Sequence, residues 1–265
     1  MEVIKEFGRI SGYKINNTKS SILVLNPGER INPINEIKQF KVVEHFSYLG
    51  VQIFPELQQV VKFNYENLMK TITASIENWT SLPISLLGRV NVLKMNILQK
   101  LFYLFQSIPL PPPPELFNWL KKNILGFLWI NRRSRLRLSL LYLPFDRGGL
   151  KCPNFKLYYW ASQLRTIMFY FTDKDNPHWV EMESHNLNLA FPLFINSDTS
   201  KKLQKHITNP ILKNMIKIWQ DVRKYLGEAN NISQFSSIWG NQLFAPGRAD
   251  GTFKIWALQG LKSVG

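Results

Sequence analysis

Arginines and aromatic residues are the side chains whose types and spacing could do chemistry in this chain. Four arginines lie within six residues: Arg132, Arg133, Arg135 and Arg137. Phe127, Leu128 and Trp129 come just before them, and Gly148-Gly149 follows. Arginine binds phosphate through two parallel hydrogen bonds, while aromatic rings and guanidinium planes stack on bases. The pattern favours a site for a polyanion with flat bases, and a solvated basic loop between two helices is the alternative.

The excess positive charge is concentrated in the middle of the chain. The 265 residues contain 33 Lys+Arg against 18 Asp+Glu, a formal net charge of +15. From Trp79 to Tyr170, thirteen basic residues stand against only Glu115 and Asp146, a net charge of +11. Such a concentrated charge is typical of nucleic-acid-binding proteins. An acidic membrane surface would feel the same field and is the rival partner.

A second polar group lies on a helix predicted over residues 84–107. Its apolar positions recur at helical spacing and form a core face. At about 100° per residue, five further side chains fall together on another face. They are Ser85, Arg89, Asn96, Lys100 and Tyr103. This stripe would suit a nucleic-acid backbone, and an ordinary solvent-facing surface is the alternative.

The chain offers few groups for catalysis. Two-metal phosphoryl transfer needs clustered carboxylates, yet no aspartate precedes Asp146. The N-terminal part carries only scattered glutamates: Glu2, Glu6, Glu29, Glu36, Glu44 and Glu56. The sequence contains neither a phosphate-binding glycine motif nor a G-x-S-x-G nucleophile motif. The residues therefore indicate a chain that binds without catalysing and without a cofactor.

Metal ligands are equally sparse. Cys152 is the one cysteine, which excludes an intramolecular disulfide, and with four scattered histidines it argues against a zinc site. One acidic cluster contains a histidine, and its members are Asp173, Asp175, His178 and Glu181. Lys174 separates the two aspartates, so the cluster is a poor metal site. We expect no metal.

Hydrophobic periodicity around these residues predicts a mostly α fold with a small α+β part at the N-terminus. Pro111–Pro114 cannot be helical, so this run predicts a stiff spacer between helices, with a ligand for an aromatic-groove module as the alternative. No secretory leader and no run of about eighteen apolar residues occurs. We therefore expect an intracellular protein, cytoplasmic or nuclear, that does not span a membrane. Helices are predicted over residues 2–10, 56–79, 84–107, 115–130, 155–171 and 211–226, and strands over 21–25 and 41–43.

Five stretches occur in a fixed order along the first 180 residues. They are Phe7-x-x-x-Ser11-Gly12-Tyr13-Lys14-Ile15-Asn16-x-x-Lys19-Ser20, Tyr48-Leu49-Gly50-Val51, Leu87-Gly88-Arg89-Val90-Asn91-Val92-Leu93-Lys94-Met95, Phe127-Leu128-Trp129 with the arginines, and Gly148-Gly149-Leu150-x-x-Pro153-Asn154-Phe155-x-Leu157-Tyr158-Tyr159-x-Ala161. Their order and spacing resemble the reverse transcriptase of LINE-type (non-LTR) retrotransposons. The resemblance is slight beyond residue 180.

The resemblance implies an organisation for the chain. The first stretch is similar to polymerase motif D, in which Lys19 would help to close on, or protonate, the leaving pyrophosphate. Tyr48, Leu49 and Gly50 are similar to the motif E or primer-grip turn. The regions expected are a palm remnant (1–55), thumb helices (56–110), a basic helical linker (111–180) and a poorly defined helical or loop tail (181–265).

The family's catalytic aspartates, including its Tyr-x-Asp-Asp turn, precede motif D, and the sequence begins after the place where they should stand. Its endonuclease, its fingers and its C-terminal Cys/His cluster have no counterpart here. The resemblance therefore implies a fragment or decayed copy that binds RNA, RNA–DNA or DNA duplex, and Mg²⁺ is expected only in a complete polymerase. Two alternatives stay open: an inert relic, and a protein-interaction module that uses the proline run and exposed aromatic residues.

Overall fold

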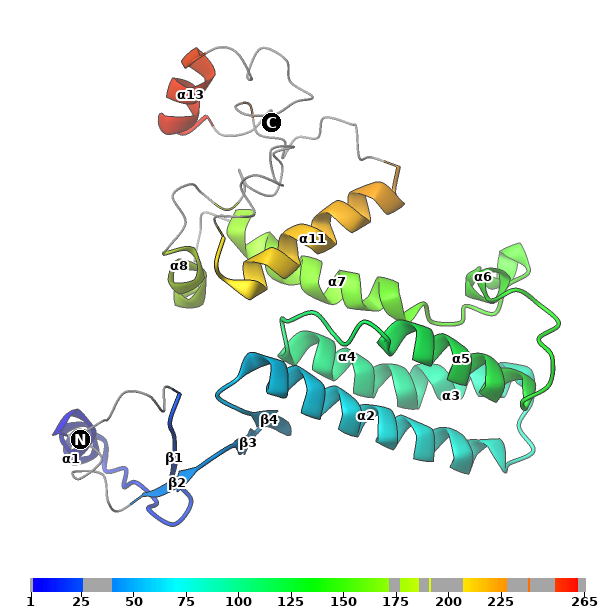
Figure 1. Ribbon diagram of the computed structural model, residues 1–265, viewed down its shortest axis with the longest axis horizontal. Coiled ribbons are helices and arrows are strands. Elements are labelled where there is room, and N and C mark those ends of the chain that lie inside the picture. Colours follow the sequence, from blue (N-terminus) through cyan, green and yellow to red (C-terminus); the bar gives the residue numbers. More distant parts are fainter. Residues whose placement is uncertain are drawn as a thin grey trace. The chain divides into compact units, whose positions relative to one another are not determined.

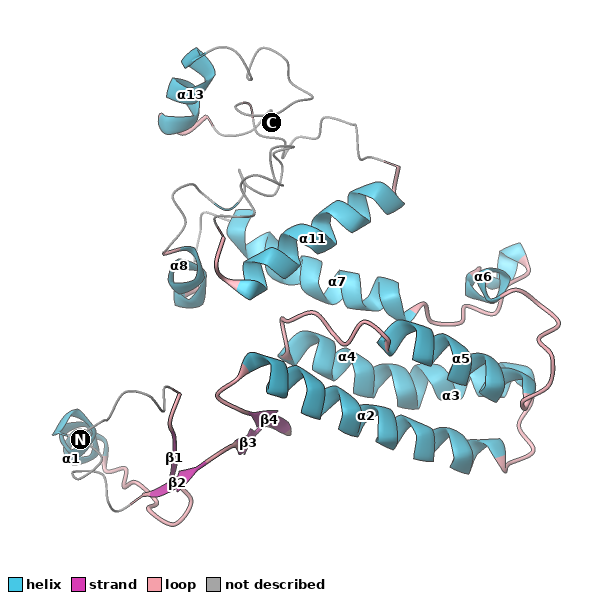
Figure 2. Ribbon diagram, in the orientation of Figure 1, coloured by secondary structure: helices cyan, strands magenta, loops and turns pink. Residues whose placement is uncertain are grey.

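The computed structural model describes residues 2–25, 40–171, 177–185, 191, 207–227, 238 and 251–261. These residues are mostly α-helical, with a small α+β part, as the sequence predicts (Figure 2). The chain divides into two compact units, Met1–Thr71 and Ile72–Gly265. The division falls inside helix α2 (Leu57–Thr80), whereas the sequence places a boundary at residue 55. The four regions expected from the sequence stay a prediction.

The first unit contains one helix and two small sheets ahead of α2. Helix α1 (Glu2–Ser11) ends before Gly12, whose φ is +74°. Strand β1 (Ser21–Leu23) pairs in parallel with β2 (Lys41–Val43). Strand β3 (Phe46–Tyr48) forms an antiparallel hairpin with β4 (Val51–Ile53). The predicted helix and strands of this region are therefore confirmed.

Helix α1 has a clear apolar face that the described structure leaves uncovered. None of its residues is buried. Val3 is 81% exposed, Phe7 60% and Ile10 77%. Parallel strands normally lie in sheets that are covered on both faces, yet β1 and β2 bury no residue in the described part of the chain. The N-terminal part of this unit thus presents apolar surface suited to packing against further polypeptide.

The second unit is a helical assembly. Its principal helices, after the end of α2, are α3 (Leu86–Val92), α4 (Leu98–Ser107), α5 (Leu116–Trp129), α7 (Phe155–Ile167) and α11 (Pro210–Tyr225). Helix α3 packs on α5, α4 on α7, and α7 on α11 (Figure 1). The helices predicted for this region are confirmed, and the proline run joins α4 to α5 without helix, as predicted.

Aromatic rings and buried polar side chains hold α4, α5 and α7 together. The rings of Phe105, Phe117 and Tyr159 meet with centroids 5.2–6.3 Å apart. Gln163 Nε2 donates a hydrogen bond of 2.5 Å to the Phe105 carbonyl. On α11, the Asn214 amide bonds with the Tyr159 hydroxyl and reaches the Pro109 carbonyl. These side chains satisfy buried polar groups that would otherwise be costly.

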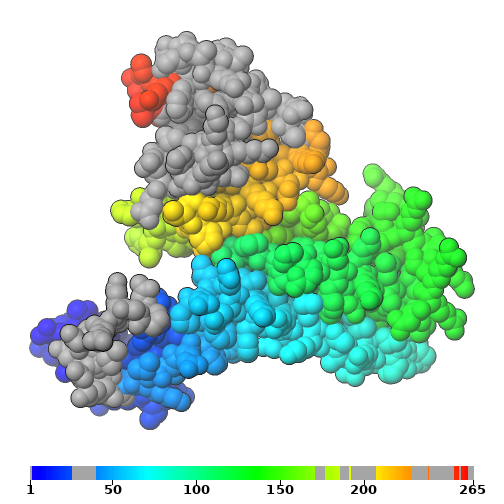
Figure 3. All heavy atoms as spheres, in the orientation of Figure 1, coloured from blue at the N-terminus to red at the C-terminus, as the bar shows by residue number. Residues whose placement is uncertain are grey.

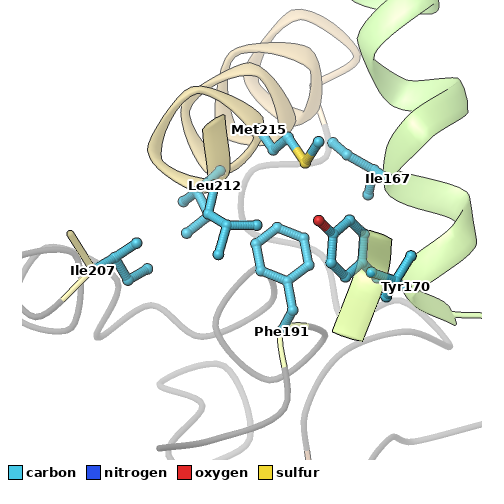
Figure 4. Packing of buried hydrophobic residues seen from close by; sticks show 8 residues of the cluster. Ile167, Tyr170, Phe191, Ile207, Leu212 and Met215 are labelled. Carbon is cyan, nitrogen blue, oxygen red and sulfur yellow. The ribbon is translucent and has the colours of Figure 1, made fainter. Parts of the chain in front are cut away.

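A second apolar cluster lies where α7 and α11 meet. Figure 4 shows Ile167 and Tyr170 facing Leu212 and Met215, with Phe191 between them. The rings of Tyr170 and Phe191 lie 4.4 Å apart between centroids, and the Tyr170 hydroxyl donates to a Glu183 carboxylate oxygen. This cluster anchors the C-terminal helices to the rest of the unit.

Some short elements escape sequence prediction. They are the strands β3 and β4, a π-helical turn, η2 (Leu93–Ile97), a 3-10 turn, η3 (Phe145–Arg147), and the short helices α6 (Leu138–Tyr142) and α8 (His178–Ser184). The helix predicted over 155–171 ends in a second 3-10 turn, η4 (Met168–Phe171). Elements of one or two turns carry too few residues for hydrophobic periodicity to stand out. Helix α13 (Gly251–Leu258) includes the apolar residues Ile255, Trp256 and Leu258 near the C-terminus. No helix in the described residues is both long enough and apolar enough to cross a membrane.

Candidate nucleic-acid interface

The arginine segment begins where α5 ends. Ile130 has the left-handed backbone angles φ 51° and ψ 51°, and Asn131 also has a positive φ of 55°. The Asn131 N–H closes the helix by donating 2.8 Å to the Gly126 carbonyl. A left-handed conformation is tolerated by asparagine but is unusual for β-branched isoleucine, and such strain costs about 1–3 kcal/mol per residue. Ile130 and Asn131 together turn the chain from the end of α5 into the four arginines.

All four arginines are exposed to solvent. No carboxylate lies within ion-pair distance of Arg132, Arg133, Arg135 or Arg137 among the described residues. Between them, Ser134 Oγ donates to the Leu136 carbonyl. In Figure 3, the segment that follows α5 is coloured green and lies at the surface of the second unit. The protein therefore leaves four cationic groups available to an anion.

Two hollows adjoin this segment. The first, of about 720 Å³, is lined by Ile84 and Leu86 before and in α3, by the last residues of α5, and by Arg132, Arg133 and Arg135. The second hollow, of about 730 Å³, lies between the end of α2 and α5. Its lining includes the charged side chains of Glu77 on α2 and Lys122 on α5. Arg132 and Ser134 line both. Positive side chains thus stand at the junction of two concave surfaces.

The polar stripe expected on the helix predicted over residues 84–107 requires a correction at Arg89. Its side chain is only 2% exposed, and its guanidinium donates to the carbonyls of Phe127 (3.1 Å), Ile84 (3.2 Å) and Leu82 (3.5 Å). The guanidinium carbon also lies 5.1 Å from the centre of the Phe127 ring. Helix α5 covers this face of α3, so Arg89 ties the two helices together. The prediction that Arg89 lies on an exposed polar stripe is therefore wrong.

The other stripe residues do not form one continuous surface. Ser85 is the N-cap of α3 and accepts a hydrogen bond from the Gly88 N–H. Lys100 is half-buried, and its Nζ donates 3.0 Å to Ser75 Oγ on α2. Asn96 is half-buried with an Oδ1 that has no partner among the described residues, and Tyr103 is 44% exposed. A π turn holds more residues than an α turn, so η2 rotates the faces of α4 away from those expected for one regular helix.

The predicted motif D and primer-grip residues lie in the first unit, apart in sequence from the arginines. Lys19 is exposed in a turn where its N–H bonds to Asn16. Leu49 and Gly50 both have positive φ, 47° and 81°, as the two-residue turn of a β-hairpin requires. Two hydrogen bonds of 2.8 and 2.9 Å join the Asn64 side chain to the backbone of Gln52 and fix this hairpin to α2. The turn expected at Tyr48-Leu49-Gly50 is therefore confirmed as a turn, and its role stays a prediction.

The Gly148-Gly149 segment is a compact loop that folds back on α6. The N–H groups of Leu150 and Cys152 both donate to the Leu141 carbonyl, and that of Lys151 donates to Leu143. Burial raises the pKa of the Cys152 thiol to about 12, although nearby Lys94 acts in the opposite direction. This thiol is therefore not a nucleophile at neutral pH. The lysines Lys94 and Lys151 lie 5.9 and 5.4 Å from the centre of the Phe145 ring.

No group of three or more His, Cys, Asp or Glu side chains that could hold a metal occurs in the described part of the chain. The predicted acidic cluster falls partly outside it, because Asp173 and Asp175 are not described. In the described part of the cluster, His178 Nδ1 and Glu181 Oε2 form an exposed pair 3.9 Å apart.

No protein-family model matches the chain.

Sequence reasoning missed the contribution of Lys122 and of the residues that open α3. Lys122 comes four residues before Gly126 on α5, and both line the second hollow. Helical spacing along α5 would have placed them on one face. Ile84 and Leu86 line the first hollow, and their sequence pattern identifies them only as apolar core positions.

Proposed function

We propose that this chain is part of a LINE-type reverse transcriptase and binds template–primer nucleic acid through its helical unit, without catalysing synthesis by itself. One observation carries the proposal. The four arginines after α5 are exposed, have no carboxylate within ion-pair distance among the described residues, and adjoin two hollows. Phosphate oxygens of RNA or of an RNA–DNA duplex match this chemistry, and the contacts position the strand without reading its bases.

Two further observations support the proposal. The sequence motifs that carry the family resemblance fall on α1 and the turn after it, on the β3–β4 hairpin turn, on α3 and η2, on the end of α5 with the arginine segment, and on the loop before α7 with α7 itself. The uncovered apolar face of α1 suits packing against further strands and helices of a palm. A complete polymerase would also bring the carboxylates for Mg²⁺, which the residues before Asp146 do not provide as a cluster.

The test is the salt dependence of binding to a labelled RNA–DNA duplex, measured by fluorescence anisotropy. Each phosphate that the protein no longer neutralises removes about one unit from the slope of log K against log salt concentration. Replacing Arg132, Arg133, Arg135 and Arg137 together by alanine should weaken binding and make the slope shallower by about three units. The matched control removes the same charge from exposed lysines elsewhere: Lys5, Lys14, Lys213 and Lys217.

The control should keep most of the affinity and of the slope. Affinity of the unchanged chain that does not differ between low and moderate salt would refute the proposal. If the quadruple arginine variant and the quadruple lysine variant lose equal affinity, binding is a general effect of net charge and does not depend on the arginine segment. In a primer-extension assay with Mg²⁺, the unchanged chain should synthesise no DNA, and metal-dependent synthesis by pure protein would refute our view of its active site.

The second candidate, an inert and partly folded relic, is favoured by one observation. Helix α1 buries none of its residues. Hydrogen exchange of the isolated chain decides this point, because an unsupported α1 and β1–β2 pair would exchange rapidly. Broad protection across residues 1–60 would count against the relic.

A further inference from the structure

The first hollow, here called the Trp129 hollow, is built from three separate segments. Ile84 and Leu86 come from the start of α3, Leu128, Trp129 and Ile130 from the end of α5, and Arg132, Arg133 and Arg135 from the arginine segment. Its volume of about 720 Å³ lies within the range of pockets that enclose small ligands. The left-handed Ile130 and Asn131 bring the arginines back over the end of α5. Strained backbone of this kind is concentrated at binding sites.

The lining of the Trp129 hollow divides into two halves of different chemistry. One half is apolar and aromatic, with Ile84, Leu86, Leu128 and Trp129. The other half carries three exposed arginines. The indole N–H of Trp129 is buried and has no acceptor among the described residues, although a buried donor is normally paired. A flat apolar group and an anion would therefore be held side by side.

Buried Arg89 strengthens the field of the hollow. It also belongs to the lining, and its three hydrogen bonds go to neutral carbonyls rather than to a carboxylate. No carboxylate side chain lines this hollow, among the described residues. The site is thus cationic in its depth as well as at its rim, which favours an anion that enters rather than one that only passes over the surface.

We propose that the Trp129 hollow binds one unpaired nucleotide, with its base against the apolar half and its phosphate on Arg132, Arg133 and Arg135. A base-paired nucleotide cannot enter, because its partner strand keeps the base inside the duplex. Inorganic phosphate would leave the apolar half unused, and an acidic peptide would offer no flat base to Trp129. The inference takes its class of ligand, a nucleic acid, from the proposed function. It adds that the protein distinguishes a strand with an unpaired nucleotide from a closed duplex.

The experiment compares RNA–DNA duplexes of equal length with a blunt end or a single-stranded overhang, and uses free AMP and inorganic phosphate as competitors. Base stacking on an aromatic side chain predicts that the overhang duplex binds about tenfold more tightly than the blunt one. AMP should remove this preference at concentrations where inorganic phosphate does not. An overhang preference that AMP does not remove would overturn the inference.

Variants separate the hollow from the general positive charge. Leu86→Trp fills the hollow without removing charge and should abolish the overhang preference while changing blunt-duplex affinity by less than about twofold. Its matched control, Leu87→Trp, alters an exposed neighbour that does not line the hollow and should keep the preference. If Leu86→Trp fails to fold, Trp129→Phe provides a second test. A nucleotide in the hollow should change the tryptophan fluorescence of the unchanged protein, and Trp129→Phe should remove that change.

The outcomes distinguish this inference from the proposed function. Equal affinity for both duplexes, or a preference that survives Leu86→Trp, overturns the inference while salt-sensitive duplex binding still supports the proposed function. Equal competition by phosphate and AMP overturns the role of the base. Binding of AMP or of single strands without any duplex binding supports the hollow and refutes the template–primer proposal.

Discussion

The buried guanidinium of Arg89 should contribute strongly to stability, and Arg89→Met tests this directly. Methionine keeps the length and apolar stem of the side chain but removes its charge and donors. It leaves the carbonyls of Phe127 and Ile84, now bonded at 3.1 and 3.2 Å, without this donor. It also removes a cation from the C-terminal end of α5, where the helix dipole favours positive charge.

The expected magnitude follows from these contacts. A hydrogen bond from a charged group is worth about 1.5–3 kcal/mol, so two good bonds contribute about 3–6 kcal/mol before desolvation is counted. Burying the charge costs several kcal/mol in the native protein, and methionine relieves that part. We expect the free energy of unfolding to fall by about 3 kcal/mol, at the upper end of ordinary point mutations.

Urea unfolding followed by circular dichroism measures the change. The midpoint should fall while the dependence on urea concentration stays the same, and amide exchange in the last turn of α5 should become faster. Arg133→Met is the matched control, because Arg133 is exposed and its replacement should change stability by less than about 0.5 kcal/mol. A change below about 0.5 kcal/mol in Arg89→Met, or a gain in stability, would refute the idea that this arginine ties α3 to α5.

Two further predictions concern the loop after α6 and alkaline pH. Gly149→Ala should destabilise the protein by about 2 kcal/mol or more, because a Cβ there would overlap the backbone carbonyl of Leu143. A Cβ at Gly148 meets open space, so Gly148→Ala should cost only about 1 kcal/mol for its positive φ. A thermal melt in which Gly148→Ala is the more destabilised variant would contradict the loop geometry. Burial raises the pKa of both Cys152 and Tyr159 to about 12, from 9 and 10. The folded protein therefore keeps protons that the unfolded chain releases, so stability is complete below pH 9 and falls as pH rises toward 12, by up to about 1.4 kcal/mol per pH unit for each group. Cys152→Ala should flatten the first part of this fall in urea titrations, and an unchanged pH profile would contradict the burial of the thiol.

The local sequence was sufficient for the longer helices. The helices predicted over residues 56–79 and 115–130 coincide with α2 and α5 to within one residue at each end, because a helix needs only one face to be covered. The concentration of arginines after α5 was likewise visible in the chain, whereas the turn at Tyr48-Leu49-Gly50 was expected from the family resemblance. Periodicity could not reveal η2, since a single π turn changes the phase of a helix without changing its composition.

What a side chain is used for was decided by tertiary packing. Arg89 and Arg133 are the same residue type in one basic region, yet the first is buried against α5 and the second is exposed. A helical wheel assigns a residue to a face, but only the neighbouring helix determines whether that face meets water, a carbonyl or an aromatic ring. The Trp129 hollow depends on the same kind of information. Its lining comes from segments about forty residues apart in sequence, and only the packing of α3 against α5, together with the strained turn at Ile130, brings them together.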